Sequence, residues 1–338
     1  MWTKHEFIEE LYKEQTNVND KPFNVEWKEQ VTEQFHRAVG KFKSSEPLNP
    51  TILSTVKKEG YTRYSIEITT LPKLTMQMYL LVPDELNQQQ ANLVLALHGH
   101  GYGNKDVVGL NADGSEKEEQ SGYHQDFAVS LVQKGLIVAV PELIGFGDRR
   151  YAPDQEPVKD SDSSCYSIAK QLLLFGKTIA GLRIFECQKV LDYLESRDDF
   201  QIGKIGCMGI SGGGLVAAFT SIVDQRISAT VISGYTSTFK GSIMDRRHCL
   251  DNYIPGILQI AELPEIIGLL APRPLFIESG IHDDLFKEPD VKVAEKRIRS
   301  IYQAFDSEEN VSAHYFDGGH EISGEYSFDW LDKNLSGK

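Results

Sequence analysis

The sequence alternates short, nearly continuous apolar runs with longer segments of helical period. The apolar runs predict strands at 93–97, 136–140, 205–210, 229–233, 275–278 and 313–316. Strands that are apolar at nearly every position are typical of a parallel sheet covered by helices on both faces. The predicted helices cover 124–134, 167–197, 213–223, 263–270, 291–305 and 325–335. The alternation therefore predicts an α/β fold.

The N-terminal part of the chain has a different pattern. Residues 6–43 hold two helical patterns, and the stretches 61–70 and 74–82 alternate as antiparallel strands do. We therefore expect an N-terminal helical extension over 1–50, followed over 51–338 by one domain with an eight-stranded, mostly parallel sheet. Because Gly176 and Gly181 lie inside the predicted helix 167–197, this segment is either one kinked helix or two helices.

Composition excludes several classes of partner. The 49 Asp and Glu outnumber the 35 Lys and Arg, for a net charge of −14. An acidic surface repels phosphate backbones and anionic lipids, so we expect neither a nucleic-acid nor a membrane partner. The apolar runs are far shorter than the ~18 residues of a membrane-spanning helix. The N-terminus shows no export signal, so a cytoplasmic location is expected.

The four cysteines do not form a recognisable motif. They lack a C-x-x-C pair and are few for the length, which favours buried, reduced thiols over a disulfide framework. We expect no redox role for them; they are Cys165, Cys187, Cys207 and Cys249.

The strongest local signal is the run Gly209-Ile210-Ser211-Gly212-Gly213, which fits G-x-S-x-G between a predicted strand and a predicted helix. A strand that turns at once into a helix strains the backbone at the central residue and leaves no room for side chains beside it. The alternative is a glycine-rich turn without chemistry. The flanking strand and helix favour Ser211 as a nucleophile.

A serine nucleophile needs a histidine base, and in this arrangement the acid and then the base follow the serine in the chain. The histidines after Ser211 are His248, His282, His314 and His320. His314 lies inside the last predicted strand, where a structural role is the better interpretation. His320 follows Asp317-Gly318-Gly319 on a flexible turn, so we predict that His320 is the base.

The acid is expected in the loop that follows the strand 275–278. This loop contains Asp283 and Asp284. Adjacent aspartates after a strand also occur as plain turn residues. We predict that Asp283 orients His320, and Asp284 stays the competing candidate.

The loop after the strand 93–97 is expected to supply part of an oxyanion hole. It reads Leu97-His98-Gly99-His100-Gly101, and the backbone N–H groups of His100 and Gly212 are the predicted donors. His98 and His100 also raise a metal site as an alternative, but the spacing marks no third ligand. We therefore expect no metal and no cofactor.

Three polar or irregular insertions leave the C-terminal ends of predicted strands, where open α/β sheets place ligands. They cover 102–122, 145–164 and 236–262. The third insertion either roofs a pocket or forms a surface or subunit contact through Met244, Arg246, Arg247, Tyr253 and Ile254. Asp148 and Arg149 in the second are expected either to bind substrate or to form a structural ion pair.

With these residues, the chain resembles the α/β-hydrolase superfamily, and within it the dienelactone-hydrolase-like and acetyl xylan esterase-like bacterial serine esterases. The resemblance covers about 51–335. Besides the run Gly209–Gly213, it rests on the runs Leu97–Gly101, Gly145–Arg150, His248–Gly256 and Ala271–Leu275. It places Ser211, Asp283 and His320 at the triad positions, with Asp284 where many members carry proline. Dienelactone hydrolases often have a cysteine nucleophile, so lactone specificity does not carry over.

The sequence thus predicts a serine hydrolase that cleaves small-molecule carboxylic esters, acetyl esters among them, through an acyl-enzyme intermediate. The alternatives are an acyltransferase or peptidase with the same triad, or a ligand-binding protein that has kept a hydrolase fold without catalysis. A homo-oligomer stays open, because nothing in the sequence determines the number of subunits.

Overall fold

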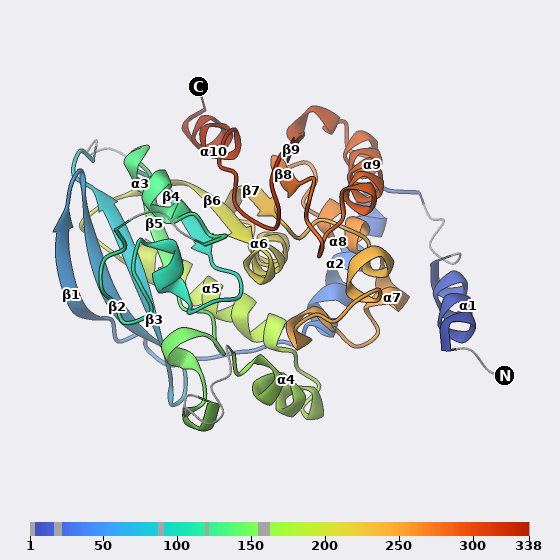
Figure 1. Cartoon of the computed structure of the whole chain (residues 1–338), viewed down its shortest axis with the longest axis horizontal. Coiled ribbons are helices and arrows are strands. Elements are labelled where there is room, and N and C mark those ends of the chain that lie inside the picture. The colour runs from blue at the N-terminus through green and yellow to red at the C-terminus, as the bar shows by residue number, and fades with distance from the viewer. Residues whose placement is uncertain (1–3, 17–21, 87–90, 119–121, 155–162, 338) are drawn as a thin grey trace.

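A computed structural model describes residues 4–16, 22–86, 91–118, 122–154 and 163–337. Its centre is one twisted sheet in the order β1-β2-β3-β5-β4-β6-β7-β8-β9 (Figure 1). The strands are β1 (Thr51–Lys58), β2 (Tyr61–Leu71), β3 (Leu74–Pro83), β4 (Ala91–Leu97), β5 (Ile137–Pro141), β6 (Ile202–Ile210), β7 (Ile227–Ser233), β8 (Leu275–Gly280) and β9 (Val311–Phe316). The pairs β1–β2, β2–β3 and β3–β5 are antiparallel, and the other neighbouring strands are parallel. The predicted mostly parallel α/β sheet is confirmed.

The sheet has nine strands within the described residues, so the prediction of eight strands was wrong. The strand that the sequence did not predict is β1, which lies at the edge of the sheet and pairs with β2. Seven of its eight residues are exposed, including Ile52 and Val56. An edge strand that buries neither face carries no apolar pattern, and therefore the sequence gives no periodic signal for it.

Helices cover both faces of the sheet, as alternate residues of β4 show. Leu93, Leu95 and Leu97 pack into the core beneath α2 (Val25–Ala38), α5 (Ile179–Glu195), α6 (Gly212–Val223), α8 (Leu263–Gly268) and α9 (Glu288–Ala304). Val94 and Ala96 pack into a second core beneath α3 (Phe127–Gln133) and α10 (Ser327–Ser336). The two cores hold the strand ends in fixed positions, and the site is built on those ends.

The predicted helix 167–197 is two helices, α4 (Cys165–Leu174) and α5. Thr178 caps the start of α5, where its side-chain oxygen accepts a hydrogen bond from the N–H of Gly181 at 2.9 Å. A Cβ at position 181 would collide with the carbonyl of Val39. The glycine thus allows the N-terminal segment to pass directly against α5.

The two predicted N-terminal helices are present as α1 (Lys4–Thr16) and α2. Helix α2 buries Trp27, Val31 and Phe35, and the ring of Phe35 lies 4.9 Å from that of Phe219 on α6. Helix α1 lies at one margin of the molecule (Figure 1), where the Tyr12 hydroxyl donates to Glu262 at 3.0 Å. No helix among the described residues is long and apolar enough to cross a membrane.

Candidate active site

Ser211 lies between the end of β6 and the start of α6 with φ 56° and ψ −124°. This backbone conformation is strained for a residue with a side chain. The Ser211 N–H donates to the carbonyl of Ser233 at 3.0 Å, which ties the turn to β7. A Cβ at position 209 would collide with the Gly213 carbonyl, and one at 213 with the Leu97 carbonyl. The flanking glycines are therefore required for the predicted strand-to-helix turn.

The buried carboxylate of Asp283 contacts the partly exposed ring of His320. The Asp283 Oδ2 atom lies 2.7 Å from His320 Nδ1. The other carboxylate oxygen, Oδ1, accepts hydrogen bonds from the N–H groups of Leu285 at 2.7 Å and Phe286 at 2.9 Å. These contacts hold the carboxylate so that His320 keeps its proton on Nδ1 and presents Nε2 as the basic nitrogen.

The structure brings Asp283 to His320 and leaves Asp284 at the surface. Asp283 is 3% exposed, whereas the side chain of Asp284 is exposed and its backbone carbonyl accepts a hydrogen bond from Arg246. Of the two candidates for the acid that the sequence offered, Asp283 is therefore the one whose carboxylate contacts His320.

The ring of His320 lies between two aromatic rings, with centroids 5.6 Å from Tyr123 and 5.8 Å from Phe286. Its edge faces Gly234, where an added Cβ would lie 3.0 Å from Cε1. Gly234 directly follows Ser233, the residue that holds the Ser211 N–H. His320 and Ser211 therefore lie against the same short segment at the end of β7.

The basic nitrogen of His320 is available for proton transfer. Nε2 is buried and has no hydrogen-bond partner among the described residues. In a site without substrate, catalytic hydrogen bonds are often long and shorten only when the substrate is bound. The arrangement can accept a proton from a hydroxyl that is delivered at the turn.

The loop with the predicted oxyanion donor packs directly on the Ser211 turn. A Cβ at Gly99 would lie 2.9 Å from the Ile210 carbonyl and 3.1 Å from the Ser211 Cβ. Gly212 occupies the first position of α6, where the N–H has no acceptor within the helix. The backbone of His100 follows Gly99 on the same loop, so both predicted donors lie beside Ser211.

Two buried histidines position this loop, and the sequence analysis did not assign them that role. His98 Nε2 accepts the Leu143 N–H at 3.0 Å, and its Nδ1 donates to the Gly99 carbonyl at 2.8 Å. Burial lowers the pKa of His98 to about 3, so the ring is neutral. His124 Nε2 accepts the Gly99 N–H at 2.9 Å. Because His124 comes from a distant segment, no local pattern signals this contact.

Glu278 is a further positioning residue that the sequence did not indicate. It is 1% exposed at the end of β8. One carboxylate oxygen accepts from the Ser233 hydroxyl at 3.0 Å and the other from the Gly324 N–H at 3.0 Å. The Ser327 hydroxyl also donates to it, at 2.7 Å. Glu278 thus joins β7 to the segment that follows His320.

A cavity of about 650 Å³ opens beside Ser211 and Gly212. Its walls come from the loop after β4, the start of α4, and the segments 235–253 and 285–286. The lining residues are His100, Ser163, Cys165, Tyr166, Ser211, Gly212, Tyr235, Arg247, His248, Cys249, Leu250, Asn252, Tyr253, Leu285 and Phe286. The cavity has the size and the mixed apolar and polar wall of a small-molecule site.

The insertion 236–262 forms one wall of this cavity. Arg247 and Tyr253 line the cavity, in agreement with the alternative that this insertion covers a pocket. Ile254 is buried in the core instead, and Arg246 contacts the Asp284 carbonyl. Met244 is exposed and is not part of the lining.

Asp148 and Arg149 are engaged in separate ion pairs. Asp148 lies 2.8 Å from Lys105, and Arg149 lies 2.6 Å from the buried carboxylate of Glu186. Neither residue lines the cavity described above. Both residues form structural ion pairs, but each pairs with another residue and not, as the sequence suggested, with the other.

Comparison with known proteins adds the family. The model of the Abhydrolase family matches residues 4–321 of the chain. A Bacillus subtilis (strain 168) protein named "Putative hydrolase YtaP" is 33% identical over 180 residues. The matched region is 52% of this chain and 56% of that relative, so the match spans little more than half of either protein.

Similar solved structures share the fold at low sequence identity. A crystal structure described as a "putative acetyl xylan esterase" from Bacteroides fragilis NCTC 9343 is 15% identical, with a TM-score of 0.79 over 99% of this chain and 95% of that one. A glucuronoyl esterase from Solibacter usitatus is 15% identical, with a TM-score of 0.63 over 91% of this chain and 90% of that one. Identities this low show a common fold alone.

Proposed function

The chain belongs to the Abhydrolase family, and on that premise we propose that it is a serine hydrolase that cleaves carboxylic esters through an acyl-enzyme intermediate. The observation that carries the proposal is the Asp283–His320 pair, whose ring has a buried Nε2 without a partner among the described residues and lies against Gly234, next to the residue that holds the Ser211 N–H. Solved proteins of the same fold, one described as a "putative acetyl xylan esterase" and one named as a glucuronoyl esterase, support ester cleavage as the reaction.

The proposed reaction has two halves. His320 Nε2 takes the proton of the Ser211 hydroxyl, and the oxygen attacks the ester carbonyl carbon to form a tetrahedral intermediate. The His100 and Gly212 N–H groups donate to its negatively charged oxygen. The intermediate collapses, and the alcohol leaves with the proton from His320. Water, deprotonated by His320, then attacks the acyl-enzyme, and as the bond between the acyl carbon and the Ser211 oxygen breaks, His320 returns the proton to that oxygen and the acid leaves.

Asp283 acts in both halves without exchanging a proton. Its carboxylate stabilises the imidazolium that His320 becomes after each proton transfer, and it holds the ring in one orientation. The two backbone N–H contacts to Oδ1 keep the carboxylate itself in place.

The cavity supports a compact ester with a polar substituent. Arg247, His248 and Asn252 offer polar groups in its lining, and Leu285 and Phe286 offer apolar surface. A small acyl group, such as acetyl, is our proposal for the acid part of the substrate. A volume of about 650 Å³ also leaves room for a larger alcohol part.

The test is hydrolysis of p-nitrophenyl acetate together with labelling by a fluorophosphonate probe. We expect the probe to modify Ser211, and Ser211→Ala to lose at least about a thousandfold in kcat. His320→Gln should lose a comparable factor, whereas His282→Gln, an exposed histidine next to the acid, should retain activity. Full activity in Ser211→Ala would reject the mechanism.

Product analysis separates the alternatives. Preferential transfer of the acyl group to an added alcohol would indicate an acyltransferase, and cleavage of an amide would indicate a peptidase. A folded protein that neither reacts with the probe nor hydrolyses any of a panel of short-chain, long-chain and sugar acetate esters would indicate a ligand-binding protein without catalysis.

A further inference from the structure

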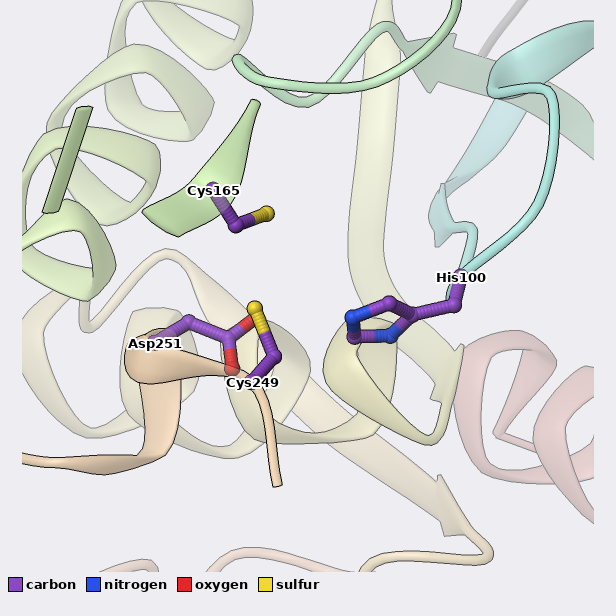
Figure 2. A group of neighbouring side chains, drawn as sticks. All are labelled: His100, Cys165, Cys249 and Asp251. Carbon is purple, nitrogen blue, oxygen red and sulfur yellow. The ribbon is translucent and has the colours of Figure 1, made fainter. Parts of the chain in front are cut away.

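Four side chains at one side of the cavity have donor atoms that converge: His100, Cys165 and Cys249 line the cavity, and Asp251 is buried beside them. An imidazole nitrogen of His100, the sulfurs of Cys165 and Cys249, and a carboxylate oxygen of Asp251 all lie within 4.8 Å of one another. Figure 2 shows the four side chains turned toward the same small space. They come from the loop after β4, the start of α4 and the insertion 236–262. We propose that this cluster binds a zinc ion.

The donor set fits zinc in number and chemistry. Two cysteine sulfurs, one imidazole and one carboxylate supply the four ligands of a tetrahedral site, and thiolates favour zinc over magnesium or calcium. With metal–sulfur distances of about 2.3 Å, tetrahedral ligands lie roughly 3.3–3.8 Å apart. From the observed limit of 4.8 Å, each ligand–ligand separation therefore has to shorten by about 1.5 Å at most.

The charges around the cluster also balance with zinc in place. Two thiolates and one carboxylate around Zn²⁺ leave a charge of −1, and the fully buried guanidinium of Arg183 supplies +1. Arg183 Nη1 donates to Asp251 Oδ2 at 2.6 Å, and its Nη2 donates to Cys165 Sγ at 2.9 Å. Asn252 donates to the other oxygen of Asp251 at 2.6 Å. Outer hydrogen bonds of this kind orient metal ligands.

Zinc binding is balanced by proton release. The two thiols lose their protons to solvent as two zinc–sulfur bonds form, and the carboxylate and the neutral imidazole bind through lone pairs that they already have. No oxidation or reduction takes place.

Of the two histidines that the sequence offers as an alternative metal site, His98 and His100, the cluster contains His100. The expectation from the sequence was that neither binds a metal. Both ring nitrogens of His98 are hydrogen-bonded to backbone groups. The pair therefore cannot chelate an ion, whereas His100 faces two sulfurs and a carboxylate that lie far from it in the sequence.

The zinc would act as a positioning element beside the Ser211 turn. A Cβ at Gly212 would lie 3.4 Å from Asp251 Oδ2 and 3.6 Å from the His100 ring, so the cluster borders the start of α6. An ion here would tie the loop that carries the His100 N–H to the insertion and to α4. Zinc binding at this cluster is independent of the proposed function and is measured without substrate.

The test measures zinc directly on the untagged protein. After incubation with excess zinc and desalting, we expect about one zinc per chain by elemental mass spectrometry. The cobalt-substituted protein should show thiolate-to-cobalt charge-transfer absorption and the intense visible bands of a tetrahedral site. Cys165→Ser with Cys249→Ser should lose the metal, and Cys187→Ala, a buried cysteine outside the cluster, should retain it.

Several outcomes would overturn the proposal. The first is absence of bound metal in the wild-type protein, and the second is a zinc content in the double variant equal to that of the wild type. The third is a Cys165–Cys249 disulfide that persists in protein prepared freshly in the presence of a reductant. If the double variant does not fold, the wild-type cobalt spectrum decides the matter, because a spectrum without thiolate charge transfer refutes coordination by cysteine.

Discussion

Replacing Asp283 by asparagine isolates the electrostatic part of the proposed mechanism. The change keeps the size of the side chain, and its oxygen can still accept the N–H groups of Leu285 and Phe286. The amide then presents N–H donors toward His320 Nδ1, which lies 2.7 Å from the carboxylate in the native protein. A ring that accepts at Nδ1 carries its proton on Nε2, and it cannot take the proton of Ser211.

The expected loss is large because both the tautomer and the stabilising charge are lost. An asparagine at the acid position of a serine triad lowers kcat by about 10⁴, or roughly 5 kcal/mol of transition-state stabilisation. The assay is steady-state hydrolysis of p-nitrophenyl acetate, with thermal unfolding measured on the same samples to separate catalysis from folding.

Asp284→Asn is the matched control. Its side chain is exposed one position along the chain, so kcat should change by less than about twofold. A kcat of Asp283→Asn within tenfold of the wild-type value, or equal losses in both variants, would refute the assignment of Asp283.

Three other predictions test what holds the site in place. Glu278→Gln should lower the free energy of unfolding in urea by about 1–3 kcal/mol and reduce kcat, because an amide nitrogen replaces an acceptor near the His320 segment; unchanged stability and kcat would contradict this role. Burial raises the pKa of Glu142 to about 8 from 4.5, so between these values the unfolded chain binds fewer protons and wild-type stability should fall as pH rises. Glu142→Gln should remove that contribution in urea titrations at several pH values, and an identical pH dependence in both proteins would contradict it. Gly213→Ala should lower both activity and the melting temperature, because its Cβ would collide with the carbonyl of Leu97; a fully active, equally stable variant would refute the close approach.

The sequence determined the parts of the fold that are buried. The parallel strands could be predicted because burial on both faces requires apolar residues at almost every position. Strand β1 could not, because its exposed residues meet no such requirement. The break between α4 and α5 was open in the sequence, and the cap at Thr178 and the close passage of Val39 at Gly181 decided it.

In the candidate site, too, some features could be predicted from the sequence and others depend on tertiary packing. The strained turn at Ser211 is recognisable in the sequence, since a Cβ at position 209 or 213 would collide with a backbone carbonyl. The expected order of acid and base in the chain follows from the order of the strands. The choice between Asp283 and Asp284 depends on which side chain turns inward, and adjacent residues give no pattern for that. The cluster of His100, Cys165, Cys249 and Asp251 exists only where three distant segments meet. Through-space contacts of this kind arise from packing, so only the tertiary structure decides them.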